Sequence, residues 1–600
     1  MTSSAVPSSS SPTPKYGSIS IHNHDDDTPA TSHSSKSSKA SNAGVPLKNV
    51  SASLSNGNSN GNSNSNSNKS INRSHSADKG NDGENDSVSS ASTYSNATEP
   101  SRRILIKTQS SFLDDLKEMR HGSIPHSTVV ALSIGVVCGS AAFVYYAALE
   151  YMLDLLWEDL PEILYENVSP SLHWTWIPLL GFFLAAFVGL SVVFLGEPGD
   201  LPYTIKCVHE KAYVAMDHVL PMVAASFFSI LGGGSLGPEA PLVAICAAIG
   251  GFVSRSIFGC TERNVIRKHT LMGMSGALAA FFGCPIGGSL FALEVCSRFG
   301  VEYFEHATEA IFCGEVCLAV FRTLARLPIK YIWTLEAGVE HMEAAETIHI
   351  AYGVGIGFAG AFVAFLFARF HATVMGWFGR NGLLRGEKAV HRALTGAVVV
   401  IGMGILVPQT MFWGEYEFQT VWTMAPASTL EHVWPTTGAT GFEMTGFGTA
   451  VVVGVTKLIA ISFTVAGGYR GGYIFPIFCS GAALGRAIYC LFPFIPVQIC
   501  TLCMAAAMNV AVTRTYLATT LILSYLAAEQ AALSVILAAS LTSLFATAYM
   551  PFIKSQVERA DMDASMFMYF DTSSDEEDKE EGKDNVVEEE DAEEHPLLVV

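Results

Sequence analysis

The sequence predicts an all-helical protein that crosses a membrane many times. Hydrophobic residues make up 49% of its 600 residues and charged residues only 15%, with a mean hydropathy of +0.33. Runs such as 127–153 and 176–195 carry almost no charge over about 20 residues or more, which is the length needed to cross hydrocarbon. Many such runs follow one another, and several are interrupted by Gly or Pro.

The two ends of the chain differ from this apolar body. Residues 1–105 are rich in Ser, Asn and Gly, and we expect a disordered cytosolic tail because they bury too little apolar surface to offset chain entropy. Residues 552–600 are expected to form an acidic cytosolic tail, with fourteen acids against two lysines between Asp571 and Glu594. The formal net charge of −20 therefore describes mainly this tail, and nucleic acid is not an expected partner because no basic face is available.

The body is predicted to be one transmembrane domain over residues 106–551, with halves at about 125–325 and 345–551. The basic stretches "SRRILIK" and "KEMRH" precede the first apolar run, so the positive-inside rule places the N-terminus in the cytosol. The twelve cysteines are scattered through the apolar runs and are expected to be small buried residues. No metal or other cofactor is expected.

One acid stands inside the apolar body where the backbone bends easily. The stretch "LGGGSLGPEAPLVAICAAIGG" (Leu231–Gly251) places glycines and Pro238 before Glu239, and Pro241 after it. Proline fits the first turn of a helix, where its missing N–H costs nothing. The stretch therefore predicts a helix, a break, and a second helix that begins near Glu239.

A second stretch, "VAGGYRGGYIFPIFCSGAALG" (Val465–Gly485), repeats this pattern. A constant offset of 235 residues relates the pairs Gly232–Gly233 and Gly467–Gly468, Gly237 and Gly472, Pro241 and Pro476, and Gly250 and Gly485. Interrupted helices at corresponding positions of two halves indicate a transport site near the bilayer midplane. Helix N-termini carry unpaired N–H groups and about half a positive charge, so converging N-termini favour an anion.

From about Pro125 to Met550, these residues resemble the CLC family of chloride channels and proton-coupled antiporters. The family's most specific motif, a glycine-flanked Glu before Pro, appears as "GPEAP". The resemblance implies that Glu239 is the gating glutamate, whose carboxylate occupies an anion position at a helix N-terminus and swings away to let anions pass. Pro238, in place of the family's frequent Lys or Arg, resembles the branch that carries "SLGPE".

Two further family motifs are present in altered form. "GYIFP" matches the pattern GxFxP with its aromatic one place late, so Ile474 would supply the backbone N–H. "PGDLP" matches GSGIP, with Gly199 in place of the anion-contacting serine and Asp200 in place of a glycine, which leaves the anion's identity open. By resemblance the anion-binding set is Gly199, Asp200, Leu201, Pro202, Gly237, Pro238, Ala240, Pro241, Gly472, Tyr473, Ile474, Phe475 and Pro476.

An arginine stands where the family usually has a small residue. Arg470 lies in the second glycine-rich break, and a charge inside a membrane is costly unless it is paired. We hypothesise that Asp200 and Arg470, one from each half, meet near the inner end of the pore; the alternative is that each faces water. By resemblance a pore-facing tyrosine follows the last span, and its counterpart here is Tyr549 or Phe552.

The family divides into channels and exchangers at a second acid. By resemblance the proton-relay position is Val295, which cannot hold a proton, while Glu294 is expected to be structural. Because Glu302, Glu305 and Glu309 could substitute, the reading as a passive channel gated by Glu239 keeps an anion/proton antiporter as its alternative. A non-conducting scaffold is a third reading. We expect no enzyme, since no His and Ser pair or HExxH spacing is present.

The resemblance also implies an architecture and a setting. It implies two inverted halves with about 17 membrane helices, and a homodimer in which each subunit has its own pore, with 281–295 and 516–550 as candidate dimer faces. The family's nucleotide-sensing domains are not expected after Met550. The tail sequence "EEHPLL" resembles an acidic dileucine signal for a sorting adaptor, formed by Glu593, Leu597 and Leu598, which favours an endosomal or vacuolar membrane over the plasma membrane.

Overall fold

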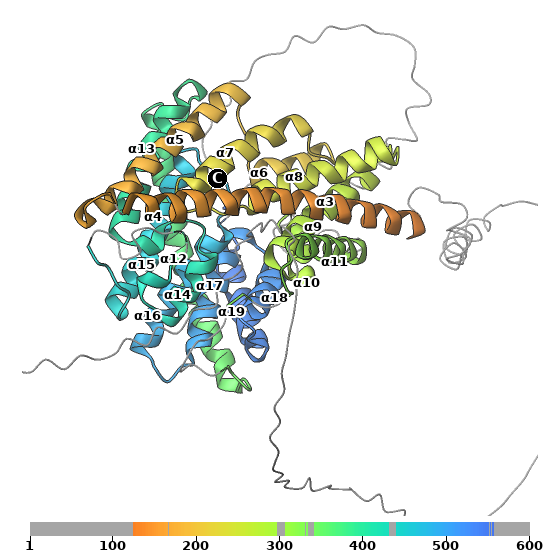
Figure 1. The fold of residues 1–600 in the computed structure, drawn as a ribbon. Coiled ribbons are helices and arrows are strands. Elements are labelled where there is room, and N and C mark those ends of the chain that lie inside the picture. The colour runs from red at the N-terminus through yellow and green to blue at the C-terminus, as the bar shows by residue number, and fades with distance from the viewer. Residues whose placement is uncertain are drawn as a thin grey trace, which may run out of the picture. The chain divides into compact units, whose positions relative to one another are not determined.

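The computed structural model describes residues 124–556, except 166, 297–306, 330–331, 334–340, 431, 433–439, 551 and 554. The described residues belong to one compact unit and form seventeen α-helices, labelled α3 to α19 (Figure 1). Among them there is no strand, only one isolated β-bridge. The all-helical prediction is confirmed. The N-terminal tail, most of the acidic tail, Glu302, Glu305 and the dileucine sequence lie outside the described residues.

The helices fall into two series of corresponding elements. The first contains α3 (Ile124–Asp154), α4 (Leu160–Tyr165), α5 (Trp176–Leu195), α6 (Leu201–Glu210), α7 (Val219–Leu231), α8 (Glu239–Phe252), α9 (Arg263–Phe282), α10 (Pro285–Glu294) and α11 (Ala307–Leu324). The second contains α12 (Thr347–Arg380), α13 (Ala389–Leu406), α14 (Glu415–Thr423), α15 (Phe447–Ala466), α16 (Ile474–Leu491), α17 (Val497–Thr513), α18 (Tyr516–Leu526) and α19 (Leu533–Ala546).

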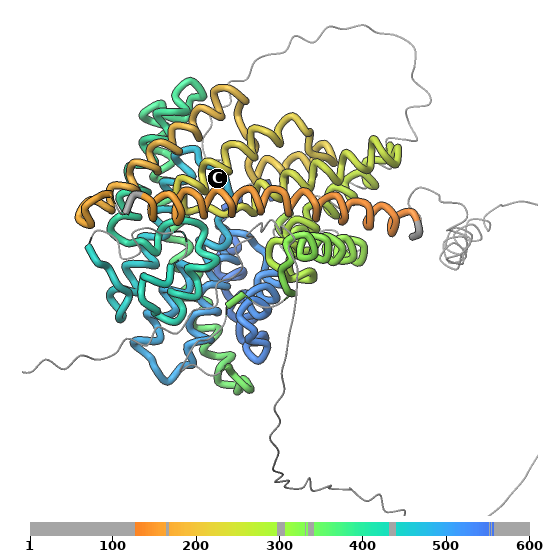
Figure 2. The backbone as a smooth tube through the Cα atoms, viewed as in Figure 1, coloured from red at the N-terminus to blue at the C-terminus, as the bar shows by residue number. Residues whose placement is uncertain are grey.

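Packing within the two series follows the same plan. In the first, α3 packs on α11, α5 on α7, and α8 on α9. In the second, α12 packs on α19, α13 on α15, and α16 on α17. The series meet through counterparts, since α5 packs against α13 and α10 against α18, and the backbone trace can be followed through both in Figure 2. This plan is the two-half architecture that the repeat predicted.

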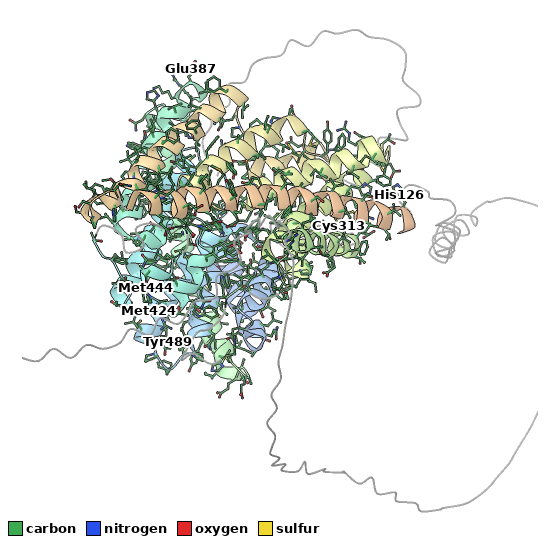
Figure 3. All side chains as sticks on the ribbon, viewed as in Figure 1. His126, Cys313, Glu387, Met424, Met444 and Tyr489 are labelled. Carbon is green, nitrogen blue, oxygen red and sulfur yellow. The ribbon has the colours of Figure 1, made fainter. Side chains whose placement is uncertain are left out.

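Burial separates the central helices from the outer ones. Every residue of α17 is buried, whereas α12 exposes Phe358, Phe362 and Leu366, which lie four residues apart on one face. Such a stripe suits contact with lipid, and seven helical segments are long and apolar enough to cross a membrane. Figure 3 shows the side chains that fill the spaces between helices. All cysteines except Cys490 are buried, as expected.

Two glycines let the central helices approach closely. A Cβ at Gly250 of α8 would collide with the carbonyl oxygen of His269 on α9. A Cβ at Gly485 of α16 would collide with the carbonyl oxygen of Cys500 on α17. These two glycines are one of the pairs predicted at the 235-residue offset. They hold the helices that follow the two breaks against their neighbours.

Candidate functional site

Two interrupted helix pairs build the candidate site. After α7 and α15 end, Gly233 and Gly468 adopt positive φ values of +74° and +83°, a conformation that favours glycine. The next helices, α8 and α16, begin at Glu239 and Ile474. Each pair of positions is separated by 235 residues, so the predicted break occurs in both halves at corresponding residues.

The two breaks are hydrogen-bonded to each other. The Gly237 N–H donates to the Gly472 carbonyl, and the Gly472 N–H donates to the Gly237 carbonyl, each over 2.7 Å. This reciprocal pair is the isolated β-bridge of the fold. Residues at the same position of the two repeats therefore touch, as they do on a two-fold axis.

Two hydroxyl groups extend the same symmetry. The Arg470 N–H donates to Ser229 Oγ over 3.0 Å, and the Ser235 N–H donates to Thr464 Oγ1 over 3.3 Å. Donors and acceptors are again related by 235 residues. Buried N–H groups need acceptors, and each break receives one from the helix of the opposite half.

Glu239 lies directly against this paired backbone. Its side chain is buried, and Oε1 accepts a hydrogen bond from the Phe475 N–H, in the first turn of α16, over 3.4 Å. Oε2 has no hydrogen-bond partner. A Cβ on either Gly237 or Gly472 would collide with Oε2. The two glycines thus make room for a carboxylate at the N-terminus of a helix from the other half.

The α6 motif joins the site from a third direction. Leu201 packs in a small cluster with Ala240 of α8. Asp200 is the N-cap of α6 and accepts from the Tyr203 N–H over 2.8 Å. Gly199 lies beside the Tyr203 ring, which a Cβ would press upon. Among the remaining motif residues, Pro202 lies in the first turn of α6, Pro238 and Tyr473 precede α8 and α16 directly, and Pro241 and Pro476 lie in their first turns.

Arg470 connects the second break to the segment before α6. Its guanidinium lies 2.6 Å from Glu197 Oε1 and 4.0 Å from Asp200 Oδ2. The hypothesised approach of Asp200 and Arg470 is therefore present, at the outer limit of an ion pair. The closer partner is Glu197, which the sequence interpretation did not single out.

Comparison with protein families agrees with this geometry. Residues 199–548 match the family model described as "Voltage gated chloride channel", which is more than half of the chain. The chain belongs to this family.

Relatives and solved structures place it further within the family. "Putative ion-transport protein YfeO" of Escherichia coli O17:K52:H18 (strain UMN026 / ExPEC) is 23% identical over 405 residues, 64% of this chain and 84% of that protein. The protein of the same name from Salmonella newport (strain SL254) is 25% identical over 399 residues, 64% of this chain and 85% of that protein. Two crystal structures share the fold. A slow cyanobacterial Cl−/H+ antiporter has a TM-score of 0.58 at 18% identity, covering 72% of this chain and 96% of that one. A CLC-type fluoride/proton antiporter has a TM-score of 0.56 at 16% identity, covering 73% and 99%.

The two candidates for the family's pore tyrosine differ in placement. Phe552 is buried, and its ring centroid lies 6.2 Å from that of Tyr473, the residue before α16. It also stacks on Phe367 of α12 at 5.6 Å. Tyr549 is fully exposed. Of the two, Phe552 is the one that contacts the site.

The acids near the family's relay position are already engaged. Glu294 is fully buried and accepts from the N–H groups of Leu517 and Ala518, over 3.2 and 2.9 Å, at the start of α18. Val295 is fully buried beside it. Glu309 forms an ion pair with Lys268. The structural role expected for Glu294 is thus visible as a cap on a helix of the other half.

Sequence interpretation missed three polar features of the site. Ser229 and Thr464 could have been found by extending the 235-residue comparison six residues before Ser235 and Arg470. Lys457 is fully buried in α15, and its Nζ donates to the carbonyl groups of Thr410, Met411 and Phe412. Its only sequence signal was a charge inside an apolar run.

Proposed function

We propose that this protein is a passive channel for chloride or a similar small anion, and that Glu239 is its gate. The observation that carries the proposal is the Glu239 carboxylate at the N-terminus of α16, with one oxygen bound to an N–H and the other without a hydrogen-bond partner. A carboxylate held there is a tethered anion. When it is protonated or moves away, the N–H groups and the helix dipole are left for a mobile anion.

The choice of a channel over an exchanger is supported by the absence of a proton carrier at Val295. Glu294 is occupied as a helix cap and Glu309 as an ion-pair partner. The second candidate is an anion/proton antiporter, which is favoured by the two antiporters that share the fold. A non-conducting scaffold is the weaker reading, because both breaks keep their glycines and their mutual hydrogen bonds.

One flux experiment separates these functions. Purified protein is placed in liposomes, and chloride efflux and proton uptake are recorded together for the wild type and Glu239→Ala. We expect chloride flux without a fixed ratio of protons, and loss of its dependence on pH or voltage in Glu239→Ala. Proton uptake in fixed proportion to chloride would establish the antiporter instead, and no flux from either protein would reject transport.

We further propose an orientation and an assembly. Because of the basic residues before α3, the N-terminus lies in the cytosol. The loop between α12 and α13, with Arg385 and Lys388, then lies on the same side, since the end of α5 packs on the start of α13. The protein forms a homodimer in an endosomal or vacuolar membrane, with its acidic tail and dileucine sequence in the cytosol.

A further inference from the structure

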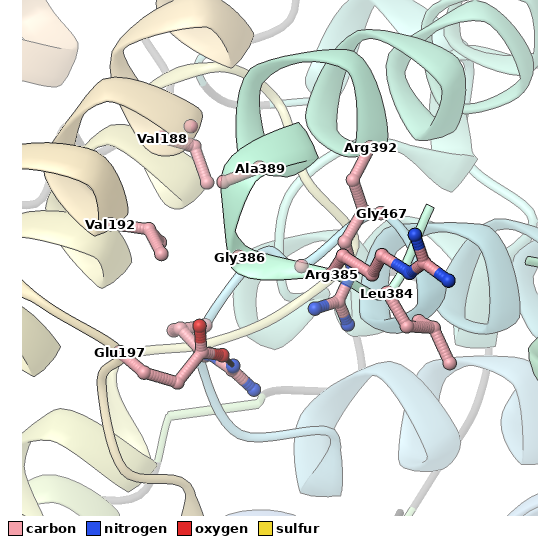
Figure 4. Close-up of a pocket in the computed structure, with 12 residues that line it drawn as sticks. Val188, Val192, Glu197, Leu384, Arg385, Gly386, Ala389, Arg392 and Gly467 are labelled. Atoms are coloured by element: carbon pink, nitrogen blue, oxygen red, sulfur yellow. Dashed lines mark hydrogen bonds and ion pairs between the residues drawn. The ribbon is translucent and has the colours of Figure 1, made fainter. Parts of the chain in front are cut away.

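A pocket lies outside the Glu239 site, where three segments meet. It forms between the end of α5, the residues that lead into α13, and the break after α15, and Figure 4 draws its lining. Its empty space is about 280 Å³, including the part open to solvent. Pockets for larger organic ligands enclose about 300–1,000 Å³. A small inorganic anion with part of its hydration shell suits this space better than a nucleotide.

The pocket is lined by positive charge. Arg385, Arg392 and Arg470 face it together with a single acid, Glu197, which gives its lining a net charge of +2. Glu197 is bound to Arg470, and Arg392 Nε donates to the Ala466 carbonyl over 2.8 Å. Among the described residues, neither Arg385 nor Arg392 has a carboxylate within ion-pair distance. Two permanently charged guanidinium groups therefore remain to attract an anion.

The same pocket is joined to the permeation site through Arg470. Arg470 lies two residues before Gly472, whose backbone pairs with Gly237 beneath the Glu239 carboxylate. Its guanidinium also lies 4.0 Å from Asp200, the N-cap of α6. An anion held by Arg385 and Arg392 would thus stand beside the segment that carries the altered family motif. Val188 and Val192 of α5 form the apolar side of the pocket, opposite these arginines (Figure 4).

We propose that this pocket is a second anion site, which collects the transported anion from water before it enters the Glu239 site. The proposal rests on the proposed anion-transport function and adds a step to it. Arg385 and Arg392 supply charge that raises the local concentration of anions, while Arg470 stays bound to Glu197 and links the pocket to the break. Anion concentration then governs how often the pathway is loaded, and Glu239 governs how often it opens.

The test measures tracer chloride exchange in liposomes with equal chloride on both sides, over a range of concentrations. This design needs no control of protein orientation. We expect Arg392→Gln and Arg385→Gln to raise the half-saturating chloride concentration about fivefold each, the effect of removing one partly screened charge near an ion, with an unchanged maximal rate. Arg380→Gln is the matched control, since Arg380 is an exposed cation at the nearby end of α12 that does not line the pocket.

The possible results separate this inference from the proposed function. If the wild type exchanges no chloride, the transport function fails. If exchange saturates normally but neither pocket variant shifts the half-saturating concentration, the pocket is not a recruitment site. An equal shift in Arg380→Gln would assign the effect to general surface potential and overturn the proposal. Arg392→Lys, which keeps the charge, should restore near-normal loading, and a variant that is merely misfolded would not be rescued in this way.

Discussion

The break between α7 and α8 and the break between α15 and α16 have the same backbone and different side chains at one position. Both contain a glycine at positive φ, both pair through a central glycine, and both receive a hydroxyl group from the opposite half. At the start of the following helix, however, the first copy has Glu239 and the second has Ile474. The shared backbone makes an anion site, and the single difference makes one copy its occupant.

The same asymmetry is found at a second pair of helices. An offset of 231 residues relates Gly283 and Arg514, which both adopt positive φ directly after α9 and α17. At that offset Glu294, at the end of α10, corresponds to Tyr525 near the end of α18. Glu294 caps α18, as Glu239 faces α16. In both cases a carboxylate of the first half lies on a helix N-terminus of the second half.

The largest expected effect comes from filling the space that the glycines leave. In Gly472→Ala the new Cβ would displace the Glu239 carboxylate from across the repeat. Overpacking of about 1–3 kcal/mol shifts the gate toward open by about tenfold or more, so closed-state chloride leak in liposomes should rise as in Glu239→Ala. Adding Gly472→Ala to Glu239→Ala should change the leak little further.

Gly402→Ala is the control for that experiment, because a Cβ at Gly402 of α13 meets nothing within 4 Å. An additive effect of Gly472→Ala in the Glu239→Ala background would show that the glycine acts on something other than the carboxylate. A silent Gly472→Ala would show that the backbone pair yields easily.

A smaller effect is expected at the other carboxylate. Glu294→Ala leaves two buried N–H groups at the start of α18 without their acceptor, which costs about 2–4 kcal/mol. Glu294→Gln keeps one acceptor oxygen and should cost about half as much. The free energy of unfolding is measured by SDS titration in mixed micelles, with Tyr525→Phe as the counterpart control. Loss of proton movement in Glu294→Gln without loss of stability would contradict the structural role.

The sequence predicted the breaks well because glycine and proline act on the backbone itself. The 235-residue offset located Gly233, Gly468 and the starts of α8 and α16, and the family resemblance added Glu239. Side-chain partners were predicted less well, because they depend on packing between segments far apart in the chain. Arg470 was paired with Asp200 at a distance where Glu197 is closer, and only the packing of Phe552 on Tyr473 distinguished it from Tyr549.

The hydroxyl groups allow a direct test of the symmetry between the breaks. Ser229→Ala and Thr464→Val each remove the acceptor of one buried N–H from the opposite half, at a cost of about 1 kcal/mol. Ser229→Ala should cost more, since its hydrogen bond is 3.0 Å long and that of Thr464 is 3.3 Å. The unfolding free energies of both variants and of the double variant give the coupling. Strict additivity would mean that the two breaks respond independently, contrary to a paired unit.

The smallest expected effect concerns the charges that only one break carries. Arg470 has no counterpart in the first half, where Ser235 stands, and its partners Glu197 and Asp200 are 58% and 29% exposed. Exposed ion pairs contribute about 0.2–1 kcal/mol and weaken with salt. In double-mutant cycles with Arg470→Gln, Glu197→Gln should therefore show a coupling of about 0.5 kcal/mol, and Asp200→Asn a smaller one, because its carboxylate is farther away and Asn can still cap α6. Both couplings should shrink as salt is raised from 0.05 to about 0.5 M. A larger coupling for Asp200 would mean that Arg470 turns toward the α6 motif in the membrane, and the charge would then belong to the permeation site and not to its entrance.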